Sequence, residues 1–295
     1  MGTWLVRRYA NTLAEARGIL AVEQETFGEC PYTAEQLQVR LGAPQQHVLV
    51  AEAAGRVVGF LSGLRTPGLQ GPRLEADLLA VHPAWQGQGI ASSLLIALRR
   101  DAGQAVTLRG VVRPANPSSS RAFARAGFSP SSIVYDLLVY HILGFAPRPL
   151  PPWEGTVRPL RGLREAERLA ALCPADLPSG ERIWAACQEA GFVLLLAATG
   201  DTICGAAELV EVHTLLYSGL WLESIHVPKS RFRLFPVLVA AAVALAKERG
   251  LDEVGCLVPQ GCWSLRVGLL GEGFRPLDSY RLWTAAPLSV GATGP

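Results

Sequence analysis

This chain of 295 residues contains few lysines and has a small net charge. Lys229 and Lys247 are the only lysines among 27 basic residues, and 25 acidic residues leave a formal net charge of +2. A balance this close to neutrality lacks the concentrated basic face of a dedicated nucleic-acid binder, so we expect no nucleic acid among the partners. The arginine bias is typical of a GC-rich genome, and arginines that clamp phosphate groups are the alternative explanation.

Long apolar runs and paired cysteines are also missing. The longest apolar run, Val237–Ala246, has about ten residues, whereas a membrane helix needs roughly 20. Met1–Asn11 lacks the apolar segment of a secretory signal. The six cysteines form no Cys-x-x-Cys pair and match neither a zinc site nor a disulfide framework. We therefore expect a cytoplasmic protein with packed thiols, no metal and no membrane partner.

What the chain does have is apolar surface and a proline-rich seam near its middle. Hydrophobic residues make up 49% of the sequence, which excludes disorder because enough surface can be buried to offset chain entropy. Gly144–Gly155 reads GFAPRPLPPWEG, a composition that favours a stiff extended linker. We predict a first domain over 1–145, a linker over 146–154 and a second domain over 155–295.

The two halves repeat one pattern in constant register. Landmarks recur 146 residues apart: Gly59 with Gly205, Leu79 with Ile225, Val81 with Val227, and Gly127-Phe128 with Gly273-Phe274. Such a register indicates two homologous domains. The hydrophobic patterns predict the order β-α-α-β-β-β-α-β-α-β in each half. The predicted fold class is an α/β sandwich, in which each half has a mixed, mostly antiparallel sheet flanked by helices.

A glycine-rich turn in the first half carries the clearest chemical signal. Leu78–Val81 reads as a buried strand, and apolar residues spaced like one helical face follow from Ile90 to Leu98. The turn Gln86–Ala91 between them delivers free backbone N–H groups to a helix N-terminus, which favours an anion such as a pyrophosphate. The spacing fits neither a Walker loop nor a dinucleotide fingerprint.

These residues resemble a known family. Gln86-x-x-Gly89-x-Ala91 after the strand is similar to the acyl-CoA signature Arg/Gln-x-x-Gly-x-Gly/Ala of the GNAT superfamily of N-acyltransferases. The segment 116–128, NPSSSRAFARAGF, resembles that family's next motif, an Asn before a helix that ends in Gly-Phe. The resemblance is good over 3–143 and weak over 155–285, so the chain looks like a tandem GNAT protein with a degenerate second copy.

The resemblance implies acetyl-CoA as cosubstrate and a set of binding residues. The backbone of the strand would hydrogen-bond the pantetheine arm, and the turn's amides would hold the pyrophosphate. In the next motif, Asn116 would bond the pantetheine or acyl region, and Phe123 would line the channel near the thioester sulfur. The residues implied are Leu79, Ala80 and Val81 for the strand, Gln86, Gly87, Gln88, Gly89, Ile90 and Ala91 for the turn, and Asn116 and Phe123 for the next motif.

The general acid of the family pattern is missing from this chain, and two residues are candidates for the general base. Many members have a Tyr as general acid where this chain has Phe123, which has no proton to donate. Tyr135 and Tyr140 are possible substitutes, with sheet packing as the alternative. Glu75 and Asp77 alternate on one face of the strand and are candidate bases, with a solvated strand start as the alternative. Asp77 is preferred because it lies nearer to Val81.

The second half keeps the landmarks but not the phosphate cradle. The 146-residue offset places Phe232 at Gln86, Phe235 at Gly89 and Cys262 at Asn116, and the loop 229–236 contains no glycine. We predict that this half does not bind CoA in the usual way. We also predict that it builds part of the acceptor pocket or stabilises the first half.

The function implied is transfer of an acetyl group from acetyl-CoA to a primary amine of a small molecule or peptide, by direct attack in the first half. One alternative is a mycothiol-synthase-like tandem enzyme, although that family keeps its active copy in the second half. Another is a catalytically inactive acyl-CoA-binding or sensor protein, which the missing Tyr at position 123 favours. The amine, the acyl length and the oligomeric state are not predicted.

Overall fold

The structure is a computed structural model that describes residues 3–28, 30–103, 106–143 and 152–288. Most of the predicted linker 146–154 lies outside the described residues. Each half contributes six strands and four α-helices to the described part of the chain, in the order predicted from the sequence.

The elements of the first half begin with a strand and two helices. Their bounds are β1 Leu5–Arg8, α1 Leu13–Phe27, α2 Ala34–Leu41, β2 Gln46–Ala53, β3 Arg56–Thr66, β4 Arg73–Val81, a 3-10 turn η1 Pro83–Trp85, α3 Ile90–Asp101, β5 Thr107–Val112, α4 Pro117–Arg125 and β6 Ser129–His141.

The second half repeats these elements. Their bounds are β7 Thr156–Pro159, α5 Leu163–Leu172, α6 Gly180–Ala186, β8 Phe192–Thr199, β9 Thr202–His213, β10 Ser218–His226, a 3-10 turn η2 Lys229–Leu234, α7 Phe235–Glu248, β11 Glu253–Pro259, α8 Trp263–Gly271 and β12 Arg275–Ala285. Several pairs, such as β2 with β8 and α4 with α8, keep the 146-residue offset at both ends.

Local sequence signals explain several helix starts. Thr33 and Gln36 form a reciprocal capping box at α2, in which each side chain accepts from the other residue's backbone N–H. Ser179 caps α6 through Arg182 N, and Thr12 caps α1 through Glu15 N. Thr33 and Ser179, which lie 146 residues apart, therefore cap equivalent helices of the two halves.

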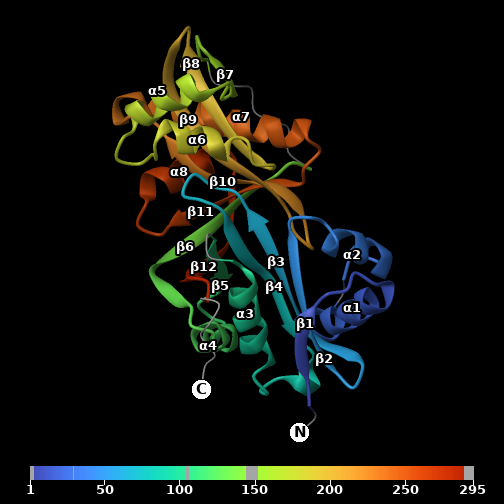
Figure 1. Cartoon of the computed structure of the whole chain (residues 1–295). Coiled ribbons are helices and arrows are strands. Elements are labelled where there is room, and N and C mark those ends of the chain that lie inside the picture. The colour runs from blue at the N-terminus through green and yellow to red at the C-terminus, as the bar shows by residue number, and fades with distance from the viewer. Residues whose placement is uncertain (1–2, 29, 104–105, 144–151, 289–295) are drawn as a thin grey trace.

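All twelve strands form one continuous sheet, in the order β1-β2-β3-β4-β5-β12-β6-β11-β10-β9-β8-β7. The pairs β4–β5 and β10–β11 are parallel and the others are antiparallel, so the predicted mixed, mostly antiparallel character is confirmed. The sheet runs from the second half at the top of Figure 1 to the first half at the bottom, with α1 and α2 on one face and α3 and α4 on the other.

The final strand of each half is exchanged with the other half. β12 lies between β5 and β6, and β6 pairs on its other side with β11. Asp136 on β6 accepts a hydrogen bond from Ser279 on β12 at 2.8 Å and pairs with Arg266 on α8. The sequence predicts two similar halves, and the structure adds that neither half's sheet is complete without a strand of the other.

The β3–β4 and β9–β10 loops are exchanged in the same way. Leu215, on the β9–β10 loop of the second half, is 1% exposed and packs in the first-half core with Ile19, Leu37 and Phe60. Leu69, on the β3–β4 loop of the first half, is 4% exposed and packs in the second-half core. The two halves are therefore interlocked through both strands and loops.

Candidate active site

The first half opens a gap in its sheet beside β4. The parallel ladder of β4 with β5 runs from Arg73–Thr107 to Ala76–Gly110, while β4 continues along β3 as far as Val81–Gly59. The strands therefore diverge beyond Ala76, and the β5-facing edge of Leu79–Val81 lies beyond that ladder. An extended ligand can add to this edge as a strand does.

The glycine-rich turn lies at the end of the same strand. Gly87 and Gly89 have φ of 78° and 84°, a region that residues with a Cβ rarely adopt. Gly89 is the N-cap of α3 and makes no side-chain cap hydrogen bond, so the first N–H groups of the helix are left for another acceptor. The helix dipole and these donors together favour an anion.

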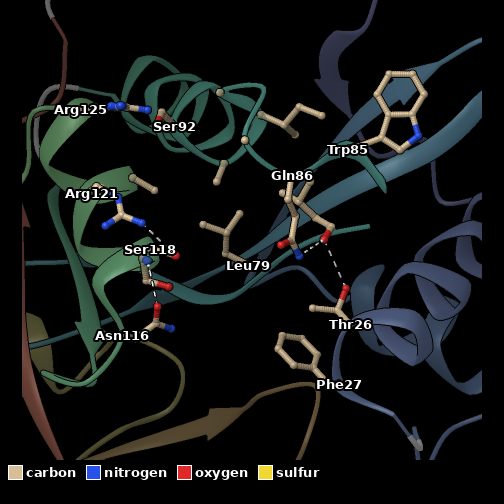
Figure 2. A pocket seen from close by; sticks show the side chains of 17 residues that line it. Thr26, Phe27, Leu79, Trp85, Gln86, Ser92, Asn116, Ser118, Arg121 and Arg125 are labelled. Atoms are coloured by element: carbon tan, nitrogen blue, oxygen red, sulfur yellow. Dashed lines mark hydrogen bonds between the residues drawn. The ribbon is translucent and has the colours of Figure 1, made fainter. Parts of the chain in front are cut away.

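A cleft of about 350 Å³ joins the open edge of β4 to this turn. Of the residues implied by the resemblance, those that line it are Leu79, Val81, Gln86, Gly87, Gly89, Ile90, Ala91 and Asn116. Figure 2 shows Leu79, Gln86 and Asn116 around the cleft, from three different parts of the chain. Ala80 and Gln88 belong to the same segments without lining the cleft.

Sequence reasoning missed further lining residues, among them two arginines. Arg121 and Arg125 lie four residues apart on α4 and line the cleft, where Figure 2 shows them on the side of α3 and α4. Their i, i+4 spacing on a helix beside the expected cleft was the available signal. The other lining residues are Thr26, Phe27, Trp85, Ser92, Ser118, Ser119 and Ala122.

Two side chains at the mouth of the cleft have defined partners. The Oδ1 atom of Asn116 accepts from Ser119 N at 3.0 Å and caps α4, which leaves its amide N–H groups for a ligand. Gln86 Nε2 donates to the Val81 carbonyl oxygen at 3.0 Å. Gln86 thus already satisfies one backbone acceptor at the end of β4.

Phe123 lies in the core rather than on the cleft. It is 4% exposed and packs edge-on against Phe128, with ring centroids 5.0 Å apart, and against Trp283 of β12 at 5.9 Å. The aromatic ring at this position therefore links α4 to the exchanged strand.

The two candidate bases on β4 have different surroundings. Glu75 accepts from Arg109 Nε at 2.7 Å and lies 3.1 Å from Arg73 Nε. Both arginines also pair with Glu223 of β10, at 2.7 Å for Arg73 and 3.3 Å for Arg109. Glu75 is thus bound within an ion network that joins the two halves.

Asp77 occupies a bulge in β4, between residues paired with Ser62 and Gly63. Burial, reinforced by the negative charge of Glu75, raises the pKa of Asp77 to about 7, and a hydrogen bond from the backbone of Leu215 opposes this shift. A carboxyl group with a pKa near 7 is suited to proton transfer at neutral pH.

Both tyrosines considered as proton donors lie on β6. Tyr135 is opposite Pro259 of β11 and Tyr280 of β12. Tyr140 is 5% exposed and packs against Phe274 in the second-half core, with ring centroids 5.7 Å apart. Neither is among the residues that line the cleft.

The second half keeps the diverging strands but fills the position of the turn. The β10–β11 ladder ends at Trp221–Gly255, and a bulge at Glu223 corresponds to the one at Asp77. Phe235, at the start of α7, is buried against Gly268 of α8, and Phe232 stacks on it with centroids 5.4 Å apart. Aromatic rings therefore stand where the first half has a glycine turn.

The structure offers no metal site and no membrane span in its described parts. No group of His, Cys, Asp or Glu side chains among the described residues could hold a metal ion. None of the helices in residues 3–28, 30–103, 106–143 and 152–288 has the length and apolar character needed to cross a bilayer.

Comparison with known proteins identifies a family match in the first half. Residues 13–128 match the Acetyltransferase (GNAT) family. An acetyltransferase of Sodalis glossinidius (strain morsitans) is 46% identical over 52 residues, which is 18% of this chain and 34% of that protein. The match thus spans about a third of that relative's length.

Two solved structures are similar over nearly the whole chain. A GCN5-related N-acetyltransferase from Sphaerobacter thermophilus has a TM-score of 0.62 at 18% identity, covering 96% of this chain and 95% of that one. A tandem GNAT protein from the clavulanic acid biosynthesis pathway has a TM-score of 0.61 at 17% identity, covering 97% and 99%.

The diverging strands and the glycine turn define a GNAT fold, the fold class of acyl-CoA-dependent acyltransferases, in tandem form. The family match lies in the first half, the tandem GNAT-like fold extends over nearly the whole chain, and residues 229–236 of the second half contain no glycine at the place of the turn.

Proposed function

We propose that the protein is an N-acetyltransferase that works at a single site in its first half, on a primary amine of a small molecule or peptide. The observation that carries the proposal is the cleft in which the open edge of β4 meets the glycine turn. The same cleft brings the matched motif residues together. Residues 229–236, at the equivalent place in the second half, do not form such a turn, which supports one working site instead of two.

Acetyl-CoA would bind along this cleft. The backbone of Leu79–Val81 would hydrogen-bond the pantetheine arm, and the amides of Gln86–Ala91 would hold the pyrophosphate at the N-terminus of α3. Arg121 and Arg125 add positive charge from α4 that suits the phosphates. Asn116 has amide N–H groups free for the pantetheine or acyl end.

The proposed chemistry is direct transfer. Asp77 removes a proton from the ammonium group, directly or through water, and the free amine attacks the thioester carbonyl carbon. Backbone N–H groups near Val81 stabilise the oxyanion, and the C–S bond then breaks to release the CoA thiolate. Asp77 is preferred to Glu75 because Glu75 is held by two arginines.

The departing thiolate needs a proton, and Phe123 cannot supply one. Tyr135 stays our candidate donor, with solvent as the alternative source. A soluble cytoplasmic location stays part of the proposal, since it rests on the sequence composition.

A second candidate function is acyl-CoA binding without turnover. Phe123 favours it, because the position that carries an acid in many relatives is here part of the core. A mycothiol-synthase-like reaction on a sugar-linked amine is a third candidate, supported by the tandem layout alone.

The test combines binding with turnover. Calorimetry with acetyl-CoA should give one site per chain, and CoA release should follow when a panel of primary amines, sugar-linked amines included, is added. Tight binding with no release for any amine would favour the sensor. Two binding sites per chain would contradict the single-site proposal.

A further inference from the structure

The turn 214–217, between β9 and β10 of the second half, lies against the part of the first half formed by α1, α2 and β4. Arg40 of α2 donates to the Thr214 carbonyl oxygen at 2.9 Å, and Tyr32 donates to the Leu216 carbonyl oxygen at 3.0 Å. The Arg40 guanidinium lies 4.4 Å from the centre of the Tyr32 ring. The turn is therefore held by side chains of the first half from two directions.

The turn is also rigid in itself. The Thr214 hydroxyl accepts from Leu216 N and Tyr217 N, each at 3.1 Å, so both amides are bound to one side chain. Tyr217 is anchored in turn by Trp221 Nε1, which donates to its hydroxyl at 2.9 Å. A turn fixed in this way presents its remaining backbone groups in one orientation.

Leu215 brings the turn against β4. Its side chain packs with Ala80 of β4 and with Val22 of α1, and its backbone interacts with the Asp77 carboxyl group. The titratable groups that face Asp77 are Glu75 on its own strand and Tyr217 on the turn. The pKa of Tyr217 is raised by burial and by the negative charge of Asp77, and further by Glu253 and Tyr280.

We propose that the turn 214–217 is a positioning element for Asp77, by which the second half prepares the base of the first half's reaction. Leu215 anchors the turn, its backbone N–H orients the carboxylate, and Tyr217 keeps water away from it. The inference rests on the proposed function for the role of Asp77 as base. The placement of Asp77 by the turn can be tested without turnover.

The chain supplies a matched control in Leu69. It inserts into the second half as Leu215 inserts into the first, and its backbone N–H donates to the Glu208 carboxylate at 3.0 Å. Leu215→Ala and Leu69→Ala each remove the same side chain from an exchanged loop, and both should lower the melting temperature. Only Leu215→Ala should change the surroundings of Asp77.

The measurement is the pKa of the Asp77 carboxyl group, from carbon NMR of the full chain labelled at aspartate, with Asp77→Asn used to assign its signal. Burial is the largest cause of the raised pKa, so a loosened turn that admits water should lower it. We expect about 7 for the native chain, a decrease of about one unit or more in Leu215→Ala, and no change in Leu69→Ala.

The pH dependence of kcat/KM provides the second readout. The apparent pKa of its acid limb should shift in Leu215→Ala in the same direction as the pKa measured by NMR. In Asp77→Asn the acid limb should disappear. An unchanged Asp77 pKa in Leu215→Ala, or an equal change in Leu69→Ala, would overturn the inference. An acid limb that persists in Asp77→Asn, with the NMR shift as expected, would instead refute the base assignment and leave the placement of Asp77 by the turn supported.

Discussion

Leu69 and Leu215 occupy equivalent places in the two halves, 146 residues apart, and each is buried in the core of the other half. The backbone of each also interacts with a carboxyl group: Leu69 N donates to Glu208, and the backbone of Leu215 interacts with Asp77. The two halves therefore contact each other as the subunits of a two-fold symmetric dimer do, although they belong to one chain. It makes the first half's site depend on residues that lie far away in the sequence.

Gly89→Val should abolish the cradle for the pyrophosphate. A β-branched residue is strained at a φ of 84°, so the turn would rearrange and its N–H groups would no longer converge. The expected result is an increase of at least about tenfold in the Kd for acetyl-CoA, equivalent to about 1.4 kcal/mol. Gly55→Val, at a φ of 74° in the β2–β3 turn, is the control for strain. Equal affinities of the two variants would contradict the assignment.

Arg121→Gln combined with Arg125→Gln should weaken acetyl-CoA binding and flatten its dependence on salt. Both arginines line the cleft, and loss of their charge removes attraction that added salt screens. Titrations at low and high ionic strength measure the effect. Arg164→Gln changes an exposed arginine on α5 and should leave both the affinity and its salt dependence as they are.

Asp77→Asn should lower kcat by about 10² to 10⁴ and leave the Kd for acetyl-CoA unchanged, since the base acts on the amine. It should also stabilise the protein at high pH. A carboxyl group whose pKa is raised to about 7 in the folded state binds more protons there than when unfolded, so folding stability falls between about pH 4 and pH 7. The melting temperature of the variant, relative to the native chain, should therefore increase from pH 5 to pH 8. A constant difference would show that Asp77 is not buried in this way.

Glu223→Gln should destabilise the join between the halves. The carboxylate pairs with Arg73 and Arg109, and the side chains of all three are less than 20% exposed. Removing one partner of a buried network leaves charge uncompensated and costs about 3 kcal/mol. Urea denaturation measures the loss. Glu35→Gln, which breaks an exposed pair with Arg17, should leave the urea midpoint nearly unchanged, because solvent screens the pair.

The separated halves, 1–150 and 151–295, should each fail to fold alone and should reassemble when produced together. Without the second half, β5 loses its neighbour β12 and β6 loses both of its neighbours. Solubility, circular dichroism and co-purification provide the measurements. A soluble, folded first half that still acetylates would contradict both the interlocking and the contribution of the second half to the site.

Sequence reasoning predicted the order of elements and eight of the 17 residues that line the cleft, because those features depend on local sequence patterns. The hydrophobic pattern of each element and the turn Gln86–Ala91 depend on residues close together in the chain, and the 146-residue register compares such local patterns between the two halves. The exchange of β6 and β12 was not predictable in this way. The two strands occupy equivalent positions in the repeat. The sequence pattern of each strand is therefore compatible with a place in its own half or in the other half.

In the candidate site, too, the features that depend on residues far apart in the sequence were not predicted. Glu75 and Asp77 are two residues apart and look alike in sequence, yet Arg73 and Arg109 hold only Glu75 in the ion network. The difference arises from the bulge at Asp77 and from Leu215, which is remote in sequence. Phe123 was expected beside the thioester and lies in the core, because Trp283 arrives from the exchanged strand to pack against it.

The position of β12 also has a consequence for how the chain is made. β12 ends at Ala285 and fills the gap between β5 and β6, two strands that leave the ribosome much earlier. The first half therefore cannot close its sheet during its own synthesis, because one edge of β5 and both edges of β6 stay unpaired until β11 and β12 have emerged. Exposed edges of this kind are prone to pairing with other chains, so the nascent first half is the species most at risk of aggregation.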